Sequence, residues 1–126
     1  MGVWSSDIMG SDLADFLSDE WSEQFGTTKV PPSSVLDFIE DYTERRPWHD
    51  TDIAQIAGYL TMQSQSKMSK KLRRVILEAI DEELLLGCVD WDVPADRKHS
   101  LTKFKHIVET YNKKGEPVTL PIATIK

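Results

Sequence analysis

The chain has 126 residues and a formal net charge of −6, with 40% hydrophobic and 29% charged residues. This composition is typical of a globular protein and argues against a disordered one, and no apolar stretch approaches the roughly 20 residues that span a bilayer. The first ten residues contain no Lys or Arg, unlike a secretory signal, so we expect a cytoplasmic protein. The length favours one domain over residues 1–126, with a helical core at 1–112.

After an irregular N-terminal segment, the first predicted helix starts at Ser11 or Asp12 and runs to about Phe25. Its apolar residues recur at helical spacing and are Leu13, Phe16, Leu17 and Trp21. The other side of the helix is acidic and contains Asp15, Asp19 and Glu23. Gly26 is expected to cap the C-terminus, because glycine adopts the left-handed backbone conformation without strain.

A second helix is expected after Pro31 and Pro32, because proline cannot continue a helix and Ser33 or Ser34 can cap the next one. Pro47 closes it, since the residue before a proline is pushed away from helical geometry. The core-facing residues of this helix are Val35, Phe38, Ile39 and Tyr42.

A third helix is predicted to start at Asp50 or Thr51. Its apolar face consists of Ile53, Ile56, Ala57 and Leu60. The four residues that follow, 63–66, are Gln and Ser in alternation, which predicts a polar connection to the next helix.

The longest predicted helix spans residues 67–86 and ends at Gly87. Its wide apolar face contains Leu72, Val75, Ile76, Ala79, Ile80 and Leu84. A turn with Trp91 at 89–94 precedes a last helix, in which Ser100 is a candidate cap and which reaches Tyr111. Its apolar face consists of Leu101, Phe104, Ile107, Val108 and Tyr111.

Residues 113–126 contain two prolines in a β-prone stretch and predict an extended tail, which could be an edge strand, a strap across the bundle or a frayed end. The five apolar faces that precede it predict an all-α fold, a compact bundle of about five helices.

The charge is distributed unevenly along the chain. Residues 1–66 contain twelve acidic and three basic residues, a net −9, whereas residues 67–126 have a net +3. An acidic half repels nucleic acid and attracts a basic protein. The alternative is a solvated acidic surface that maintains solubility.

The sequence contains no Gly-rich phosphate loop, no Gly-x-Ser-x-Gly elbow and no His-Glu-x-x-His helix. His99 and His106 could share a helical face and hold a metal, but surface positions on a Lys-rich helix account for them. The acidic residues 81–83 are expected to be solvated. Cys88 is the one cysteine, so it forms no internal disulfide, and it is expected to pack as a small apolar residue. We therefore expect no enzyme and no cofactor.

A basic cluster opens the longest predicted helix and consists of Lys67, Lys70, Lys71, Arg73 and Arg74. Cations at a helix N-terminus oppose the macrodipole, so their placement favours a function such as phosphate contact.

The tryptophans divide into core and surface candidates. Trp21 is expected in the core, whereas Trp48 and Trp91 lie in acidic loops and are candidates for exposed anchors in an interface.

The chain opens with Met1-Gly2-Val3-Trp4, followed by Ile8 and an Asp-rich helix start at 11–17. This opening, together with the pattern Trp-x-x-Pro-x-x-Arg at 91–97, resembles a bacterial family of unknown function whose members begin with Met-Gly-x-Trp-Gly. The chain departs from that pattern at Ser5. The resemblance implies a small helical domain without catalytic residues. Families of this kind are often encoded near secreted toxins and act as immunity proteins.

These observations predict a non-enzymatic protein-binding domain, specifically an immunity or antitoxin-type inhibitor that covers a basic toxin with an acidic face. Membrane association is not expected. The alternative is a nucleic-acid-associated regulator that uses the basic cluster. The expected partner-binding residues are Asp37, Glu40, Asp41, Glu44, Trp48, Asp50 and Asp52.

Overall fold

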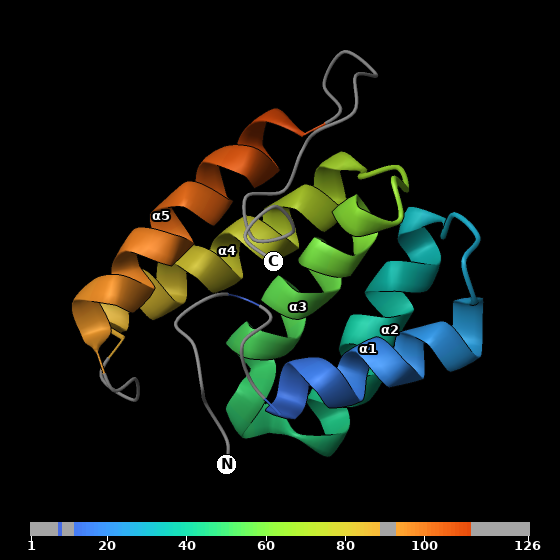
Figure 1. Ribbon diagram of the computed structural model, residues 1–126, viewed down its shortest axis with the longest axis horizontal. Helices are drawn as coiled ribbons and strands as arrows, with labels where there is room; N and C mark the ends of the chain where they lie inside the picture. The colour runs from blue at the N-terminus through green and yellow to red at the C-terminus, as the bar shows by residue number, and fades with distance from the viewer. Residues whose placement is uncertain (1–7, 9–11, 89–92, 112–126) are drawn as a thin grey trace.

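The computed structural model describes residues 8, 12–88 and 93–111, and these form helices without any strand (Figure 1). The elements are α1 (Asp12–Phe25), α2 (Pro32–Arg45), the 3₁₀ turn η1 (Pro47–His49), α3 (Asp50–Gln63), α4 (Lys70–Leu86) and α5 (Pro94–Thr110). The predicted all-α bundle of about five helices is confirmed. No described helix has the length and apolar character needed to cross a membrane. The predicted N-terminal segment, the turn around Trp91 and the tail at 113–126 lie outside the described residues.

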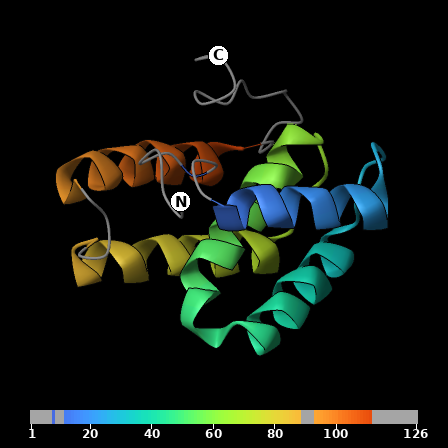
Figure 2. The same cartoon turned by 60° about the horizontal axis from the view of Figure 1, so that its bottom comes forward.

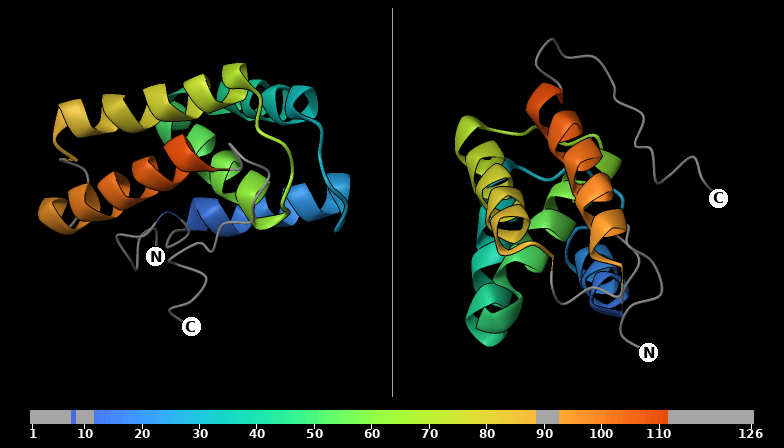
Figure 3. Two further views of the ribbon diagram at one scale, coloured as in Figure 1. Left: turned by 90° about the horizontal axis from the view of Figure 1, so that it is seen from above. Right: turned by 90° about the vertical axis from the view of Figure 1, so that its left-hand side faces the viewer.

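The helix α3 occupies the centre of the bundle. Figure 2 shows α1 and α5 on one side of it and α2 and α4 on the other, and Figure 3 shows the same arrangement from two further directions. All residues at positions 53–62 are buried, including Gln55 and Thr61. The predicted stripe of four apolar residues therefore understates this burial. A helix that is surrounded on every side buries its whole circumference rather than one face.

Aromatic side chains fill the space between α1 and α2. Trp21 contacts Phe25 and Phe38 with ring centroids 5.0 and 5.3 Å apart, and Phe38 contacts Tyr42 at 4.7 Å. Phe16 was predicted to face the core but is 37% exposed, and its ring packs edge-on against Tyr42. The Arg46 guanidinium lies 4.9 Å from the centre of the Phe16 ring, so the outer ring face is partly covered.

Three predicted helix starts were wrong. The helix α2 begins at Pro32 rather than after Ser33 or Ser34, because proline is tolerated in the first turn, where no backbone N–H is needed. The helix α5 begins at Pro94 for the same reason, which places Ser100 inside the helix.

The predicted glycine stops are confirmed. Gly26 and Gly87 end α1 and α4 with φ of +63° and +81°.

The helix α4 begins three residues later than predicted, at Lys70. The Ser69 hydroxyl accepts a hydrogen bond from the backbone N–H of Leu72 at 3.1 Å and caps the helix there. In the polar connection that precedes it, Gln63 and Gln65 are exposed, whereas Ser66 is fully buried. Its hydroxyl accepts the Val30 N–H at 2.8 Å, and its carbonyl accepts the Tyr111 hydroxyl at 2.8 Å, which ties three chain segments together.

Candidate functional site

Four carboxylates line the outer surface of α2 and are called the acidic face here: Asp37, Glu40, Asp41 and Glu44. All four residues are exposed, because the opposite side of the helix is buried against α3, α4 and the aromatic side chains of α1. Asp41 forms an ion pair with Arg45 at 3.2 Å. No described residue forms an ion pair with the other three carboxylates. Within the described part of the chain, three carboxylates of the acidic face are thus exposed to solvent without a paired cation.

An exposed tryptophan follows the acidic face in the chain. Trp48 lies in η1, between α2 and α3, and is 74% exposed. The neighbouring Asp50 is also exposed, and its Oδ1 accepts the Thr51 N–H at 2.8 Å at the start of α3. Trp48 and Asp50 are thus both exposed and follow the end of α2 within five residues, and their role in binding a partner stays a prediction.

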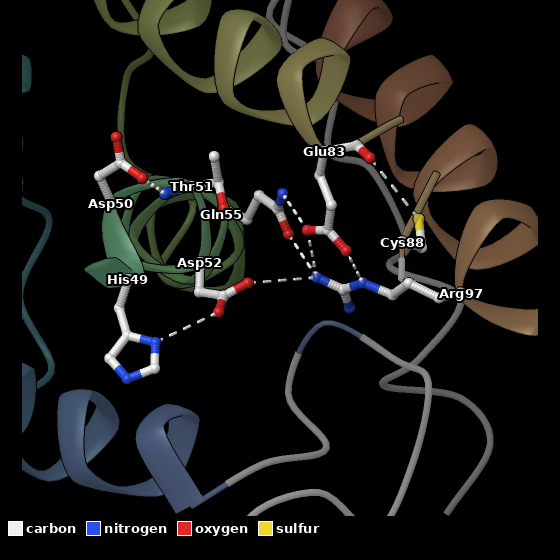
Figure 4. Close-up of polar contacts among 8 residues, drawn as sticks. All are labelled: His49, Asp50, Thr51, Asp52, Gln55, Glu83, Cys88 and Arg97. Carbon is white, nitrogen blue, oxygen red and sulfur yellow. Dashed lines mark hydrogen bonds and ion pairs between the residues drawn. The ribbon is translucent and has the colours of Figure 1, made fainter. Parts of the chain in front are cut away.

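Asp52 differs from the other predicted site residues, because the structure turns it inward. Its Oδ1 lies 3.7 Å from Arg97 Nη2, and its Oδ2 lies 3.7 Å from His49 Nδ1 (Figure 4). Burial raises the pKa of Asp52 and the nearby Glu83 carboxylate raises it further, which outweighs the opposing effect of Arg97 and His49. Asp52 therefore takes part in the network around Arg97, and its side chain, which is 31% exposed, is less available to a partner than the carboxylates of the acidic face.

A buried polar network joins α3, α4 and α5 around Arg97, which is only 2% exposed. Arg97 Nε donates to Glu83 Oε2 at 2.7 Å, and Nη2 donates to Glu83 Oε1 at 3.1 Å and to Gln55 Oε1 at 2.6 Å. Gln55 Nε2 in turn donates to Glu83 Oε1 at 2.9 Å. Figure 4 shows these side chains converging from the three helices.

The sequence interpretation missed this network, since it placed Glu83 in a solvated stretch. Spacing was the available signal: Glu83 follows the buried Ile80 by three residues, and Arg97 precedes the buried Leu101 by four. Burial alone would raise the pKa of Glu83, but the hydrogen bonds and charge of Arg97 outweigh it and hold the pKa below its ordinary value. Among the described residues no buried side-chain nitrogen or oxygen lacks a hydrogen-bond partner, so the network links α3, α4 and α5 without an unsatisfied polar group there.

Candidate reactive groups among the described residues are few. Cys88 is buried, and burial together with the nearby Glu83 charge raises the pKa of its thiol, which keeps it neutral. His99 and His106 are both exposed. Within the described part of the chain, no group of three or more His, Cys, Asp or Glu side chains is arranged to hold a metal ion.

Two shallow hollows flank α1. One, called the α1–α2 hollow, measures about 320 Å³ and adjoins the acidic face; its lining residues are Gln24, Phe25, Ser34, Asp37, Phe38 and Asp41. The other measures about 280 Å³ and is lined by uncharged residues only: Ser18, Trp21, Ser22, Gly26, Thr27, Leu60, Gln63 and Ser64. Of these two hollows, the α1–α2 hollow combines aromatic and carboxylate groups.

The basic cluster divides into two parts in the structure. Arg73 turns toward α5 and donates hydrogen bonds to the carbonyl oxygens of Val108 and Tyr111, the latter at 3.1 Å. It therefore satisfies orphan carbonyls at a helix end. The remaining cations are exposed and consist of Lys67, Lys70, Lys71 and Arg74.

Comparison with known proteins found no relative of this chain. No family model matches the chain, and no curated protein or solved structure matches it.

Proposed function

We propose that this chain is a non-enzymatic protein-binding domain, an immunity or antitoxin-type inhibitor that covers a positively charged toxin domain. The observation that carries the proposal is the acidic face: three of its four carboxylates have no ion-pair partner among the described residues, although the second half of the chain is rich in Lys and Arg. Clustered charge that is not neutralised internally is available to attract a partner.

Electrostatic attraction and apolar contact make different contributions to such binding. A negative surface accelerates the encounter with a positive partner and orients it, whereas slow dissociation comes from short-range contacts that exclude water. Trp48 is suited to the second role, because large exposed aromatic side chains are enriched at the energetic centres of interfaces. The network around Arg97 supports both roles, since it fixes the start of α3 and with it η1.

The experiment compares two charge-reversal variants that carry the same change in charge at the same helical spacing. Glu40→Lys/Glu44→Lys alters the acidic face, and Glu78→Lys/Glu82→Lys alters exposed positions of α4. Each purified protein is used to isolate partners from the native host, and the partner recovered by wild type is then purified. We expect the α4 variant to recover this partner and the acidic-face variant to lose it.

The rate of association with the purified partner is then measured by stopped flow at increasing salt. Charge steering predicts that the wild-type rate falls by at least about tenfold between low and high ionic strength. It also predicts a slower rate for the acidic-face variant than for the α4 variant at low salt. A rate that does not depend on salt, or equal rates for the two variants, would contradict recognition by the acidic face.

The exposed part of the basic cluster supports one alternative function, nucleic-acid binding. Lys67, Lys70 and Lys71 lie before or within the first turn of α4, where they oppose the helix dipole. A gel shift with mixed DNA and RNA at low salt tests this alternative. Binding that is abolished in Lys70→Glu/Lys71→Glu would support it, and the absence of any shift in wild type would exclude it.

A further inference from the structure

We propose that the α1–α2 hollow binds the guanidinium group of an arginine side chain from the partner protein. This inference rests on the proposed function, because it names the chemical group that the acidic face recognises. It goes further by assigning that recognition to a defined place in which aromatic rings and carboxylates occur together.

The hollow has an apolar base and a charged rim. Phe38 is 3% exposed and forms part of its base, and Phe25 is partly exposed beside it. Asp37 and Asp41 both line the hollow and lie four residues apart on α2, so their side chains are neighbours on one face of the helix. The helices α1 and α2 contact each other mainly through aromatic rings, and these rings form the base between them.

The residues that line the hollow match the donor pattern of a guanidinium group. This group is planar, carries five N–H donors and stacks on aromatic faces, whereas a lysine ammonium is a compact and more strongly hydrated charge. Two carboxylates one helical turn apart can accept hydrogen bonds from different edges of the same group. An aromatic ring beneath the group adds a cation–π attraction. Arginine is therefore expected to bind better than lysine.

The protein already binds its own guanidinium groups in this way at the other end of the same row of rings. Phe16, Tyr42, Phe38 and Phe25 form a continuous row with successive centroid distances of 6.0, 4.7 and 6.1 Å. The Arg46 guanidinium covers Phe16 at 4.9 Å, and that of Arg45 covers Tyr42 at 5.0 Å.

The Arg45 group shows the full combination of contacts, because it also pairs with Asp41 Oδ2 at 3.2 Å. At the other end of the row Phe38 is buried by its neighbours, and Phe25 is partly exposed without a described cation over its ring. Asp41 retains its second oxygen as an acceptor, since an ionised carboxylate offers about four lone-pair sites. The Phe25 end of the row therefore combines a partly exposed ring with Asp37 and the second oxygen of Asp41, and no described arginine lies over it.

The test uses two synthetic peptides that differ in one residue, acetyl-Gly-Gly-Arg-Gly-Gly-amide and its lysine counterpart. Each is titrated into the isotope-labelled full chain at physiological salt, and the ring signals of Phe25 and Phe38 are followed by NMR. We expect saturable shifts of both rings with the arginine peptide. We expect the lysine peptide to bind several-fold more weakly, because it lacks the planar stacking group.

Two variants with equal loss of charge locate the binding. Asp37→Asn/Asp41→Asn removes both carboxylates of the hollow, and Glu78→Gln/Glu82→Gln removes two exposed carboxylates of α4 at the same helical spacing. We expect about a three- to tenfold loss of affinity for the arginine peptide in the first variant and less than about twofold in the second. Melting curves of both variants verify that each remains folded.

Three outcomes would overturn the assignment of the hollow. These are no shift of the Phe25 and Phe38 rings, equal affinity for the two peptides, or equal weakening by the two variants. The third outcome would indicate a diffuse acidic surface and would leave the proposed function intact. Failure of the proposed function would appear separately, as association with the partner protein that does not depend on salt.

Discussion

At the scale of single residues, Arg97 is the most consequential side chain of the core. A buried ion pair loses the hydration of both charges, so its net contribution to stability is small unless every hydrogen bond is made. Glu83 and Gln55 supply those bonds at 2.6 to 3.1 Å. Replacing one partner alone would leave the other charge buried without compensation, which is much more costly than the loss of the pair as a whole.

We expect Arg97→Met to destabilise the protein by roughly 3–5 kcal/mol, because it leaves the Glu83 carboxylate buried without a cation. The double variant Arg97→Met/Glu83→Met should recover much of this loss, since both charges are removed together. Urea denaturation followed by circular dichroism measures both effects. A double variant as unstable as the sum of its single variants would show that the two side chains act independently.

The network also predicts how stability depends on pH. The pKa of Glu83 is lowered in the folded state, so its contribution to stability is complete above its ordinary value of 4.5 and is lost as the pH falls further. We therefore expect the free energy of unfolding to decrease on acidification. The difference in free energy between wild type and Glu83→Gln should narrow as the pH falls, which denaturation at a series of pH values between about 3 and 7 would measure.

Asp52 provides a control, because its effect on stability changes with pH in the opposite direction to that of Glu83. Its pKa is raised on folding, so the unfolded chain releases this proton first as the pH rises past 3.8, and stability from this group decreases. The Asp52→Asn variant should therefore gain more stability than wild type over the same rise in pH. A smaller gain would contradict the inward, partly desolvated position of Asp52.

At the scale of the elements, the close approach of α3 and α4 depends on Gly58. A Cβ atom added at this position would lie 2.9 Å from Ile76 Cδ1 and 3.0 Å from Cγ2, which is closer than normal contact. Glycine costs about 1 kcal/mol of helix stability relative to alanine. Its presence in the central helix is explained by the proximity of α4.

We expect Gly58→Ala to destabilise the protein by about 1 kcal/mol, because crowding against Ile76 exceeds the gain in helix propensity. The same substitution in an Ile76→Val background should cost less, because valine lacks Cδ1, the nearest of the three close atoms, although it keeps both Cγ atoms. Chemical denaturation of the four proteins in this double-mutant cycle gives the coupling energy, which we expect to be at least about 0.5 kcal/mol. Additive effects would contradict the proposed crowding.

The sequence predicted where each helix lies better than it predicted the residue at which each helix starts. Apolar spacing located every helix correctly, because an amphipathic face requires a period of 3.6 residues. Helix starts were harder, since Pro32 and Pro94 lie in the first turn and Ser69 caps α4 from inside the predicted helix. Several residues near each start could serve as a cap, and packing selects among them.

At the scale of the whole molecule, the arrangement of the helices separates the charges. The four helices around α3 also divide in a second direction: the acidic helices α1 and α2 lie on one side of it in Figure 1, and α4 and α5 lie on the other. The described ion pair Lys105–Asp81, at 2.8 Å, lies within the α4–α5 side and leaves the acidic face unaffected. The proposed recognition of a basic partner depends on this separation.

Because α3 is enclosed by the other helices, its amides should be the last to exchange with solvent. We expect native-state hydrogen exchange at positions 56–62 to require global unfolding, with a free energy equal to that from chemical denaturation. The first turn of α5 is exposed apart from Arg97 and should exchange through smaller local openings. Faster exchange in α3 than in the outer helices would contradict a bundle built around it.

The sequence by itself determined the all-α class, the five apolar faces, the glycine stops and the acidic character of the first half. These features are local, because helical periodicity and charge content can be recognised within a single segment. The tertiary structure decided that Gln55, Glu83 and Arg97 are buried, that Asp52 turns inward and that Phe16 faces outward. A polar side chain is buried only where partners from distant segments satisfy it, and no single segment of the sequence contains those partners.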